Sequence, residues 1–355
     1  MSSTPARLGS ALARTAVAAT LTAAGTAVGY KLTTRALRGR YSFAGKTCVV
    51  TGGSRGFGLV IARKLVRAGA AVAICARDAD QVRRAADELA RRGEPGRVVG
   101  GVCDVTDRES VRRFLATVTE ALGPVDLLVN NAGLISFGPQ ASLTPQDYED
   151  SLATHFWGPY FFTEEVLPAM KRRRSGRILN IASIGGRVPL VHGNAYTVGK
   201  HALVGYSEGL RTEAVKFGVY VTTACPGLMR TGSPRHALIR GKHEVEYAGF
   251  KILDSLPGLS CSAEYAADAA LGAVKEGRAE VIPPWPFAAV ATFHDTFRNF
   301  SLDLLGLLGR AMPDAPGPIG AQTTPAVKGY EVETPLSRSA LTGLTQRAAV
   351  RNNEV

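Results

Sequence analysis

The segment that decides the fold reads Thr51-Gly-Gly-Ser-Arg-Gly-Phe-Gly58, and it directly follows the strand-like run from Thr47 to Val50. Its glycines let the backbone turn sharply, approach a phosphate closely and pack a helix tightly on a sheet. The helix expected after the turn presents free N–H groups to negative charge. The segment therefore predicts a cradle for a dinucleotide. The expected contacts are Thr51, Gly52, Ser54, Arg55, Gly56, Phe57 and Gly58.

A second group of functional side chains lies far downstream. Tyr196 and Lys200 are four residues apart, and Ser183 precedes Tyr196 by thirteen. Residues at i and i+4 share one helix face, so the Lys200 ammonium is expected near the Tyr196 phenol. A free tyrosine has a pKa of about 10, and a nearby cation favours its phenolate. The spacing thus predicts Tyr196 as acid and base, Lys200 as its activator, and Ser183 as hydrogen-bond donor to the reacting oxygen.

Seven strand-like runs alternate with segments of helical length. This alternation is typical of an α/β fold with a doubly wound parallel sheet. It predicts one catalytic domain over residues 41–286. The expected strands are Thr47 to Val50, Ala71 to Ala76, Val98 to Val102, Leu127 to Val129, Arg177 to Ile181, Tyr220 to Thr223 and Glu280 to Ile282.

With these motifs in this order, the chain resembles the classical short-chain dehydrogenase/reductase family, from about Phe43 to Pro286. The resemblance implies a Rossmann fold, a nicotinamide cofactor and hydride transfer, with Lys200 also holding the nicotinamide ribose. It places Asp104 and Val105 beside the adenine and Asn131 beside that ribose. A buried turn-forming role is the alternative for Asn130 and Asn131. Further cofactor contacts implied by the resemblance are Ala132, Gly133, Pro226, Gly227 and Thr231.

One position departs from the family pattern. The family usually carries Asn-x-x-Gly on the helix after the fourth strand, whereas this chain reads His155-Phe-Trp-Gly158. His155 is therefore either a modified proton relay, with an ordinary pKa of about 6.5, or a residue that packs the helix. His192 and His201 lie near Tyr196 in the sequence; surface positions are expected for both, and contact with the substrate is the alternative.

The cofactor is expected to be NADP. An NAD cradle normally places an acidic residue about twenty positions after the glycines, on the ribose 2′-hydroxyl. This chain has Ala76 and Arg77 there, and Arg55 lies inside the glycine loop. Two guanidinium groups are suited to a 2′-phosphate. The alternative is that Asp78 takes the role of the acid.

The substrate loop is expected to follow Pro226-Gly227 and to run from Leu228 to Ser260. Its apolar content implies a lipophilic alcohol or ketone, such as a steroid, retinoid or acyl chain, although apolar loop residues also serve to dock a loop on the core. The apolar residues are Leu228, Met229, Leu238, Ile239, Tyr247, Phe250, Ile252, Leu253 and Leu256, with Phe137, Leu190 and Val191 at the expected pocket mouth.

The leading hypothesis is therefore an NADP-dependent oxidoreductase acting on a lipophilic alcohol or ketone. The alternative from another class is a scaffold or sensor that binds NADP without turnover, and only His155 favours it. An epimerase or dehydratase relative is a third reading, although such enzymes usually have longer substrate domains. A homo-oligomer is expected.

Composition narrows the remaining classes. Five scattered cysteines without a C-x-x-C pair predict buried thiols, with neither a disulfide nor a metal site. The net charge of +12 arises largely near the N-terminus, where seven basic residues precede Thr47 and no acidic residue occurs before Asp78. No aromatic-interleaved basic patch or reader motif is present, so nucleic-acid binding is not expected.

Two extensions flank the expected domain. Within residues 1–40, sixteen uncharged residues lie between Arg14 and Lys31. They are a candidate membrane anchor, a surface tail or a cleaved signal. If they span a membrane, the basic C-terminal flank places the catalytic domain on the cytoplasmic side; otherwise a cytoplasmic protein is expected. Residues 287–312 predict one amphipathic helix, packed on the domain, paired with a partner helix or facing a membrane. An irregular tail is expected over 313–355.

Overall fold

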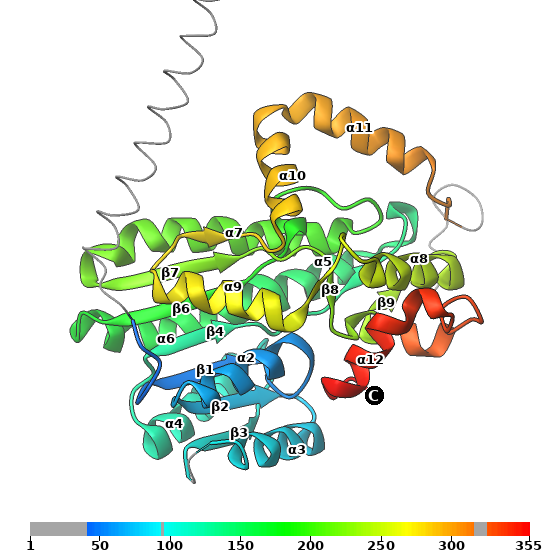
Figure 1. Ribbon diagram of the computed structural model, residues 1–355. Coiled ribbons are helices and arrows are strands. Elements are labelled where there is room, and N and C mark those ends of the chain that lie inside the picture. Colours follow the sequence, from blue (N-terminus) through cyan, green and yellow to red (C-terminus); the bar gives the residue numbers. More distant parts are fainter. Residues whose placement is uncertain (1–40, 94–95, 316–324) are drawn as a thin grey trace, which may run out of the picture. The chain divides into compact units, whose positions relative to one another are not determined.

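The computed structural model describes residues 41–93, 96–315 and 325–355, and the elements below belong to the unit Ser42–Val355. Seven parallel strands form the central sheet in the order β11-β7-β6-β4-β1-β2-β3 (Figure 1). Each expected strand is present, and the predicted doubly wound α/β fold is confirmed. The strands are β1 (Thr47–Thr51), β2 (Ala71–Ala76), β3 (Val98–Val102), β4 (Leu127–Asn130), β6 (Gly176–Ile181), β7 (Val219–Ala224) and β11 (Glu280–Val281).

Helices cover both faces of this sheet because every parallel connection must cross over it. Helix α2 contacts α3 and α9 on one face, while α4 contacts α6 on the other, where α7 packs against β7. The order of strands reverses at β1, so the loops after β1 and β4 diverge at the carboxyl edge, where ligands bind in such sheets. The helices are α2 (Gly56–Arg67), α3 (Ala79–Ala90), α4 (Arg108–Leu122), α5 (Pro145–Leu152), α6 (Gly158–Arg172), α7 (Asn194–Ala214) and α9 (Ala263–Lys275).

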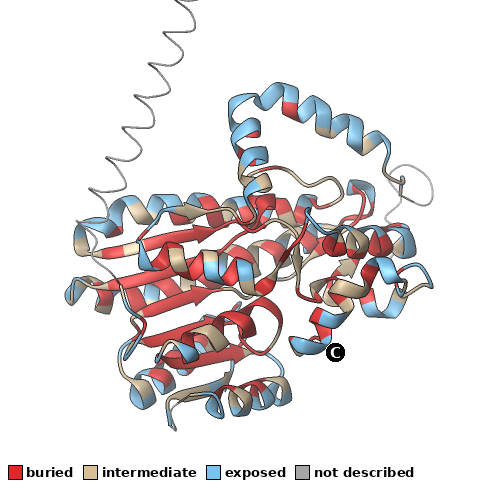
Figure 2. Ribbon diagram, viewed as in Figure 1, coloured by how far each residue is buried: buried red, intermediate tan, exposed pale blue. Residues whose placement is uncertain are grey.

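The core lies between the sheet and its helices, and the inner strands β1, β2, β4, β6 and β7 are almost wholly buried in Figure 2. Central strands are hydrophobic on both faces because helices cover both; Val49, Leu128 and Ile178 are all fully buried. All five cysteines are free and buried, and two of them, Cys48 and Cys75, lie within strands of this sheet. No described helix combines the length and apolar character needed to cross a bilayer, and the candidate anchor over residues 15–30 lies outside the described residues.

Short elements build a lobe beside the carboxyl edge of the sheet. Strand β9 pairs with both β5 and β12, and β8 pairs with β10. Helix α8 lies in this lobe, within the expected substrate loop. The elements are β5 (Ser136–Phe137), β8 (Met229–Arg230), β9 (Leu238–Ile239), α8 (His243–Ser255), β10 (Cys261–Ser262) and β12 (Val327–Lys328).

The C-terminal extension differs from the sequence prediction. The expected single helix is two, α10 (Trp285–Thr296) and α11 (Arg298–Arg310), because the backbone leaves the helical region at Phe297. The expected irregular tail is also wrong for its described part. Residues 325–355 contain β12, the 3₁₀ helices η6 (Gly329–Val332) and η7 (Ala340–Thr342), and α12 (Gly343–Arg351). This order rests on contacts with residues distant in sequence, which local periodicity does not reveal.

A substitution at Gly58 tests how closely α2 must approach the sheet. A Cβ atom there would lie 2.2 Å from the carbonyl oxygen of Gly52 and 2.4 Å from the Asn131 side chain. We expect Gly58→Ala to lower the free energy of unfolding by about 1–3 kcal/mol, since backbone must shift. Urea denaturation measures it. Gly205→Ala is the control, because its Cβ meets nothing within 4 Å, and it should stabilise α7 by about 0.5–1 kcal/mol. Equal effects would contradict the close-approach argument.

Candidate active site

The glycine loop is fastened to the loop that follows β4. The Thr51 hydroxyl accepts hydrogen bonds from the backbone N–H of Asn131 (2.9 Å) and of Ala132 (3.0 Å). In return, the Asn131 amide donates to the carbonyls of Thr51 (3.0 Å) and Gly52 (3.2 Å). The Asn131 side chain therefore holds the turn, as in the alternative reading, while Asn130 donates to Asn180 inside the core (2.8 Å).

The start of α2 is suited to an anion. Helix α2 has no side-chain cap and no acidic residue in its first turn. Gly56 has a φ of +55°, and a Cβ atom there would lie 2.3 Å from a carboxylate oxygen of Glu354. The side chain of Glu354 is only 4% exposed, so a buried anion already lies over the glycine loop. Free N–H groups and the helix dipole favour phosphate for the same reason, and the residues present therefore fit a dinucleotide.

The end of β2 carries no free carboxylate. Asp78 is exposed and caps α3 by accepting the backbone N–H of Gln81 (2.9 Å). Arg77 is exposed, and no hydrogen bond or ion pair is found for it in the described part of the chain. Ser54 is buried and lies 3.5 Å from the Gln81 side chain. Arg55 pairs with Glu354 at 3.7 Å.

Asp104 and Val105 lie after β3. The Asp104 carboxylate accepts the backbone N–H (2.9 Å) and hydroxyl (2.8 Å) of Thr106, which shapes the turn. Val105 is buried beside Gly158, where a Cβ atom would lie 3.1 Å from it. Both residues thus stand at the carboxyl edge, two strands away from β1.

The predicted acid/base residues meet at the carboxyl end of β6. Ser183 follows this strand, and its hydroxyl accepts the Gly185 N–H (3.1 Å). Helix α7 brings Tyr196 within hydrogen-bond contact of Ser183. One turn farther along α7, the buried Lys200 donates to the carbonyl of Ile181 (2.9 Å), and its ammonium lies 5.6 Å from the Tyr196 ring centroid. The helix spacing thus places the side chains together as expected.

The electrostatics of the pair differ from the sequence expectation. Burial raises the pKa of Tyr196 to about 12, against the lowering effect of the Ser183 hydrogen bond. Burial also lowers the pKa of Lys200 to about 7, so its charge is only partly present at neutral pH. Burial thus favours the neutral phenol of Tyr196 over its phenolate.

His155 lies beside Tyr196, in a π-helical turn (Ala153–Trp157). Its Nε2 accepts the Leu134 N–H (3.3 Å), its Nδ1 lies 3.2 Å from the Ser151 hydroxyl, and its ring meets the Tyr196 ring edge-on at 5.4 Å. Burial, then the Lys200 charge, lowers the pKa of His155 well below its usual value. The imidazole stays neutral, and both of its nitrogens are engaged. This favours a role for His155 in positioning Tyr196 over a role as a proton relay that becomes charged.

The remaining predicted residues shape loops. Pro226 accepts the Ile184 N–H (2.8 Å), and a Cβ atom at Gly227 would meet the Phe287 ring at 2.2 Å. Thr231 is buried and accepts the N–H of Ser233 (3.1 Å). Gly133 approaches His155, with 3.2 Å between its ideal Cβ position and Nε2. No described cluster of His, Cys, Asp or Glu is arranged to hold a metal ion.

Both neighbouring histidines were expected at the surface. His201 is exposed, as expected, whereas His192 lies 2.8 Å from the buried Glu246 of α8, which ties the loop before α7 to the substrate lobe. Sequence reasoning also missed Asp254, which is buried on α8 and accepts the N–H of Met229; burial raises its pKa to about 8. Glu354 was missed as well, because nothing local signals a contact spanning almost 300 residues.

The sequence profile of the short chain dehydrogenase family matches residues 46–237. The chain is 40% identical over 185 residues to the granaticin polyketide synthase putative ketoacyl reductase 1 of Streptomyces violaceoruber, covering 52% of this chain and 67% of that protein. A short-chain dehydrogenase structure from Streptomyces avermitilis aligns with a TM-score of 0.65 and 30% identity, over 75% of this chain and 98% of the other. An actinorhodin polyketide ketoreductase variant with NADPH aligns with a TM-score of 0.60 and 31% identity, over 67% and 95%.

His155 should make stability depend on pH. Its pKa is lowered in the folded chain, so below about pH 6.5 the unfolded chain binds the extra proton and stability falls as the pH falls. The loss is up to about 1.4 kcal/mol per pH unit. In His155→Asn, we expect the free energy of unfolding, measured with urea, to change less between pH 6.5 and pH 5 than in the wild type. The pH profile of turnover near neutrality should show the same ionisations in both proteins. An ionisation that vanishes from the turnover profile would instead establish a relay.

Proposed function

This chain belongs to the short chain dehydrogenase family, and we propose that it is an NADP-dependent oxidoreductase that transfers hydride between the nicotinamide and a lipophilic alcohol or ketone. The observation that carries the proposal is the meeting of Ser183, Tyr196 and Lys200 at the sheet edge that also bears the glycine cradle. The bound cofactor would supply the hydride. The chain's own residues supply the proton and orient the substrate.

The ionisation states favour reduction as the direction. Tyr196, with a pKa of about 12, is a phenol that donates its proton to a carbonyl oxygen. Ser183 donates a second hydrogen bond and stabilises charge on that oxygen as it becomes an alcohol. Lys200, whose ammonium lies 5.6 Å from the centroid of the Tyr196 ring, would return a proton to the tyrosine after each turnover, because its pKa of about 7 lets it gain or release a proton near neutrality. Reduction also agrees with the names of the ketoacyl reductases that the chain is similar to.

NADP is favoured over NAD by charge at the end of β2. Arg77 is exposed there without a partner among the described residues, and Arg55 adds a second guanidinium from the glycine loop. Both residues would hold a 2′-phosphate by charge-assisted hydrogen bonds. Asp78 caps α3 through one of its carboxylate oxygens, which ties it to the start of that helix.

A lipophilic substrate is supported by the surroundings of the site, although part of the predicted apolar loop has another role. Ile239 and Tyr247 are fully buried in a cluster with Phe137 and Phe250, so they dock the lobe. Leu190 remains partly exposed and packs, as Phe287 and Leu305 do, against the buried cluster of Ile184, Val188 and Ala291. Helices α10 and α11 thus border the loop that follows Ser183, and an apolar wall there suits an apolar substrate.

Membrane attachment is supported by an exposed apolar surface on the same two helices, which stand out from the domain in Figure 1. The surface would lie in the interfacial region of a bilayer and draw apolar substrates toward the wall of α10 and α11. It would act beside residues 1–40, with the catalytic domain on the cytoplasmic side. A homo-oligomer is part of the same proposal. The exposed residues are Trp285, Val290, Phe293, Phe297, Phe300, Leu302, Leu304, Leu307 and Leu308.

Tyr196→Phe tests the proton donor. We expect turnover of lipophilic ketones, followed by NADPH absorbance, to fall at least about 100-fold because only the hydroxyl is lost. NADPH affinity should stay within a few-fold. Tyr265→Phe is the control, since this substitution removes the same hydroxyl group from a half-exposed side chain on α9. Undiminished turnover in Tyr196→Phe would remove the assignment.

Arg77→Ala tests the cofactor. The KM for NADPH should rise about tenfold or more, because a charged contact to the 2′-phosphate is lost, while the KM for NADH should stay within about twofold. Arg84→Ala, at an exposed position on α3, is the matched control. A wild type that already prefers NADH would show that the interpretation of Arg77 is wrong.

Vesicle flotation tests the membrane proposal. The full chain should float with phospholipid vesicles, and removal of residues 1–40 should weaken flotation while leaving turnover intact. In the shortened chain, the double substitution Phe297→Ser and Phe300→Ser should abolish the flotation that remains, since both side chains are more than half exposed. A full chain that stays in the unbound fraction would leave α10 and α11 as packing or dimer elements.

A further inference from the structure

We propose that residues 352–354, the closing segment, occupy the phosphate end of the cofactor cradle and must withdraw before the nicotinamide cofactor binds. The inference rests on the proposed function, because it assigns the chain's own competitor to that site. In Figure 1 the end of α12 lies beside the loop between β1 and α2, although the two are far apart in sequence. Loading of the cofactor is therefore a competition within one molecule.

The closing segment uses the groups that a phosphate needs. The Gly56 N–H, at the start of α2, donates to the carbonyl of Asn352 (2.8 Å). The Asn353 amide donates to the carbonyl of Ser54 (2.9 Å), which fixes the segment along the loop. Each N–H at a helix start serves one strong acceptor, so a phosphate and the Asn352 carbonyl exclude each other at Gly56.

Glu354 adds the competing charge. Its side chain is 4% exposed, lies 3.7 Å from Arg55 Nε and 3.1 Å from His236 Nε2, and sits directly over Gly56. His236 also contacts the backbone carbonyl of Glu354 (3.0 Å). A carboxylate in this place satisfies the positive end of the helix dipole, and it would repel a second anion brought into the same small space.

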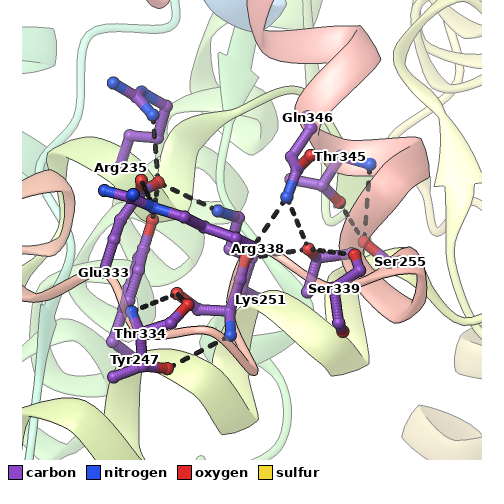
Figure 3. A network of polar contacts seen from close by, with 12 residues as sticks. Arg235, Tyr247, Lys251, Ser255, Glu333, Thr334, Arg338, Ser339, Thr345 and Gln346 are labelled. Atoms are coloured by element: carbon purple, nitrogen blue, oxygen red, sulfur yellow. Dashed lines mark hydrogen bonds and ion pairs between the residues drawn. The ribbon is translucent and has the colours of Figure 1, made fainter.

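The closing segment follows residues 333–351, the base, which are bound firmly to the lobe that contains α8. Figure 3 shows Glu333 at the centre of a cluster in which it contacts Arg235 (3.1 Å), Lys251 (3.1 Å) and Arg338 (2.9 Å). Farther along, the Ser255 hydroxyl of α8 donates to Thr345 of α12 (2.7 Å). These contacts hold residues 333–351 on the substrate lobe. Only the residues after α12 need to move to open the cradle.

This arrangement links two parts of the site. Helix α8 carries both Lys251 and Ser255, which hold the base, and it belongs to the substrate lobe. A change in α8 on substrate binding would therefore alter the position of the closing segment. The affinity measured for the cofactor is reduced by the fraction of molecules in which the cradle is closed.

The test compares NADPH affinity, by fluorescence titration, in the full chain, in a chain ending at Arg351, and in Glu354→Gln. Both changes should tighten binding, by about fivefold to thirtyfold for the shortened chain, because the competitor is gone. Glu331→Gln makes the same chemical change at an exposed position nearby and should leave the affinity unaltered. Amide hydrogen exchange gives a second readout: NADPH should increase exchange over residues 351–355 of the full chain.

Weaker binding by the shortened chain would mean that the segment belongs to the bound site, and this would overturn the proposal, as would equal affinities with unchanged exchange. Binding of NADPH by the full chain in either case would leave the proposed function standing. Absence of NADPH and NADH binding in both the full and the shortened chain would overturn the two together. Binding only after shortening would support both.

Discussion

The close approach of two backbones at the carboxyl edge of the sheet is the constraint on which the site depends. The loop after β1 and the loop after β4 are joined through Thr51 and Asn131, and no side chain fits between Gly52 and Gly58. This junction directs the start of α2 toward the carboxyl edge of the sheet, where a ligand would bind. It also leaves the N–H groups there without protein side-chain caps. An anion is the natural partner for such a helix start.

Charge in the site is set by burial more than by pairing. Spacing alone suggested that Lys200 lowers the pKa of Tyr196, but Lys200 is buried and Tyr196 is partly buried, and burial favours the neutral form of each. The neutral His155 extends this pattern beside the tyrosine. A site composed of neutral donors suits a reaction in which the substrate oxygen, and not the protein, gains charge as the bond to it changes.

The fold and the acid/base residues were predictable because their signals are local. Seven apolar runs, the glycine segment and the Tyr196–Lys200 spacing each lie within a few residues, and each is formed by the described structure as expected. The break at Phe297 was missed because the apolar period continues through it. The ordered tail was missed because its partners, Lys251 and Ser255, lie 80 to 90 residues away. The amide of Asn131 holds the glycine turn, which is the alternative that its sequence context also allowed.

Helix α8 presents two faces with separate duties. Tyr247, Lys251 and Ser255 recur every four residues and contact the tail, whereas Phe250 stacks on Phe137 and Asp254 accepts from Met229. Both faces are therefore constrained, the first by the tail and the second by the packing that docks the lobe on the domain. Libraries that randomise the whole helix would discard most variants through loss of one or the other, so a change of substrate is easier to obtain outside this helix.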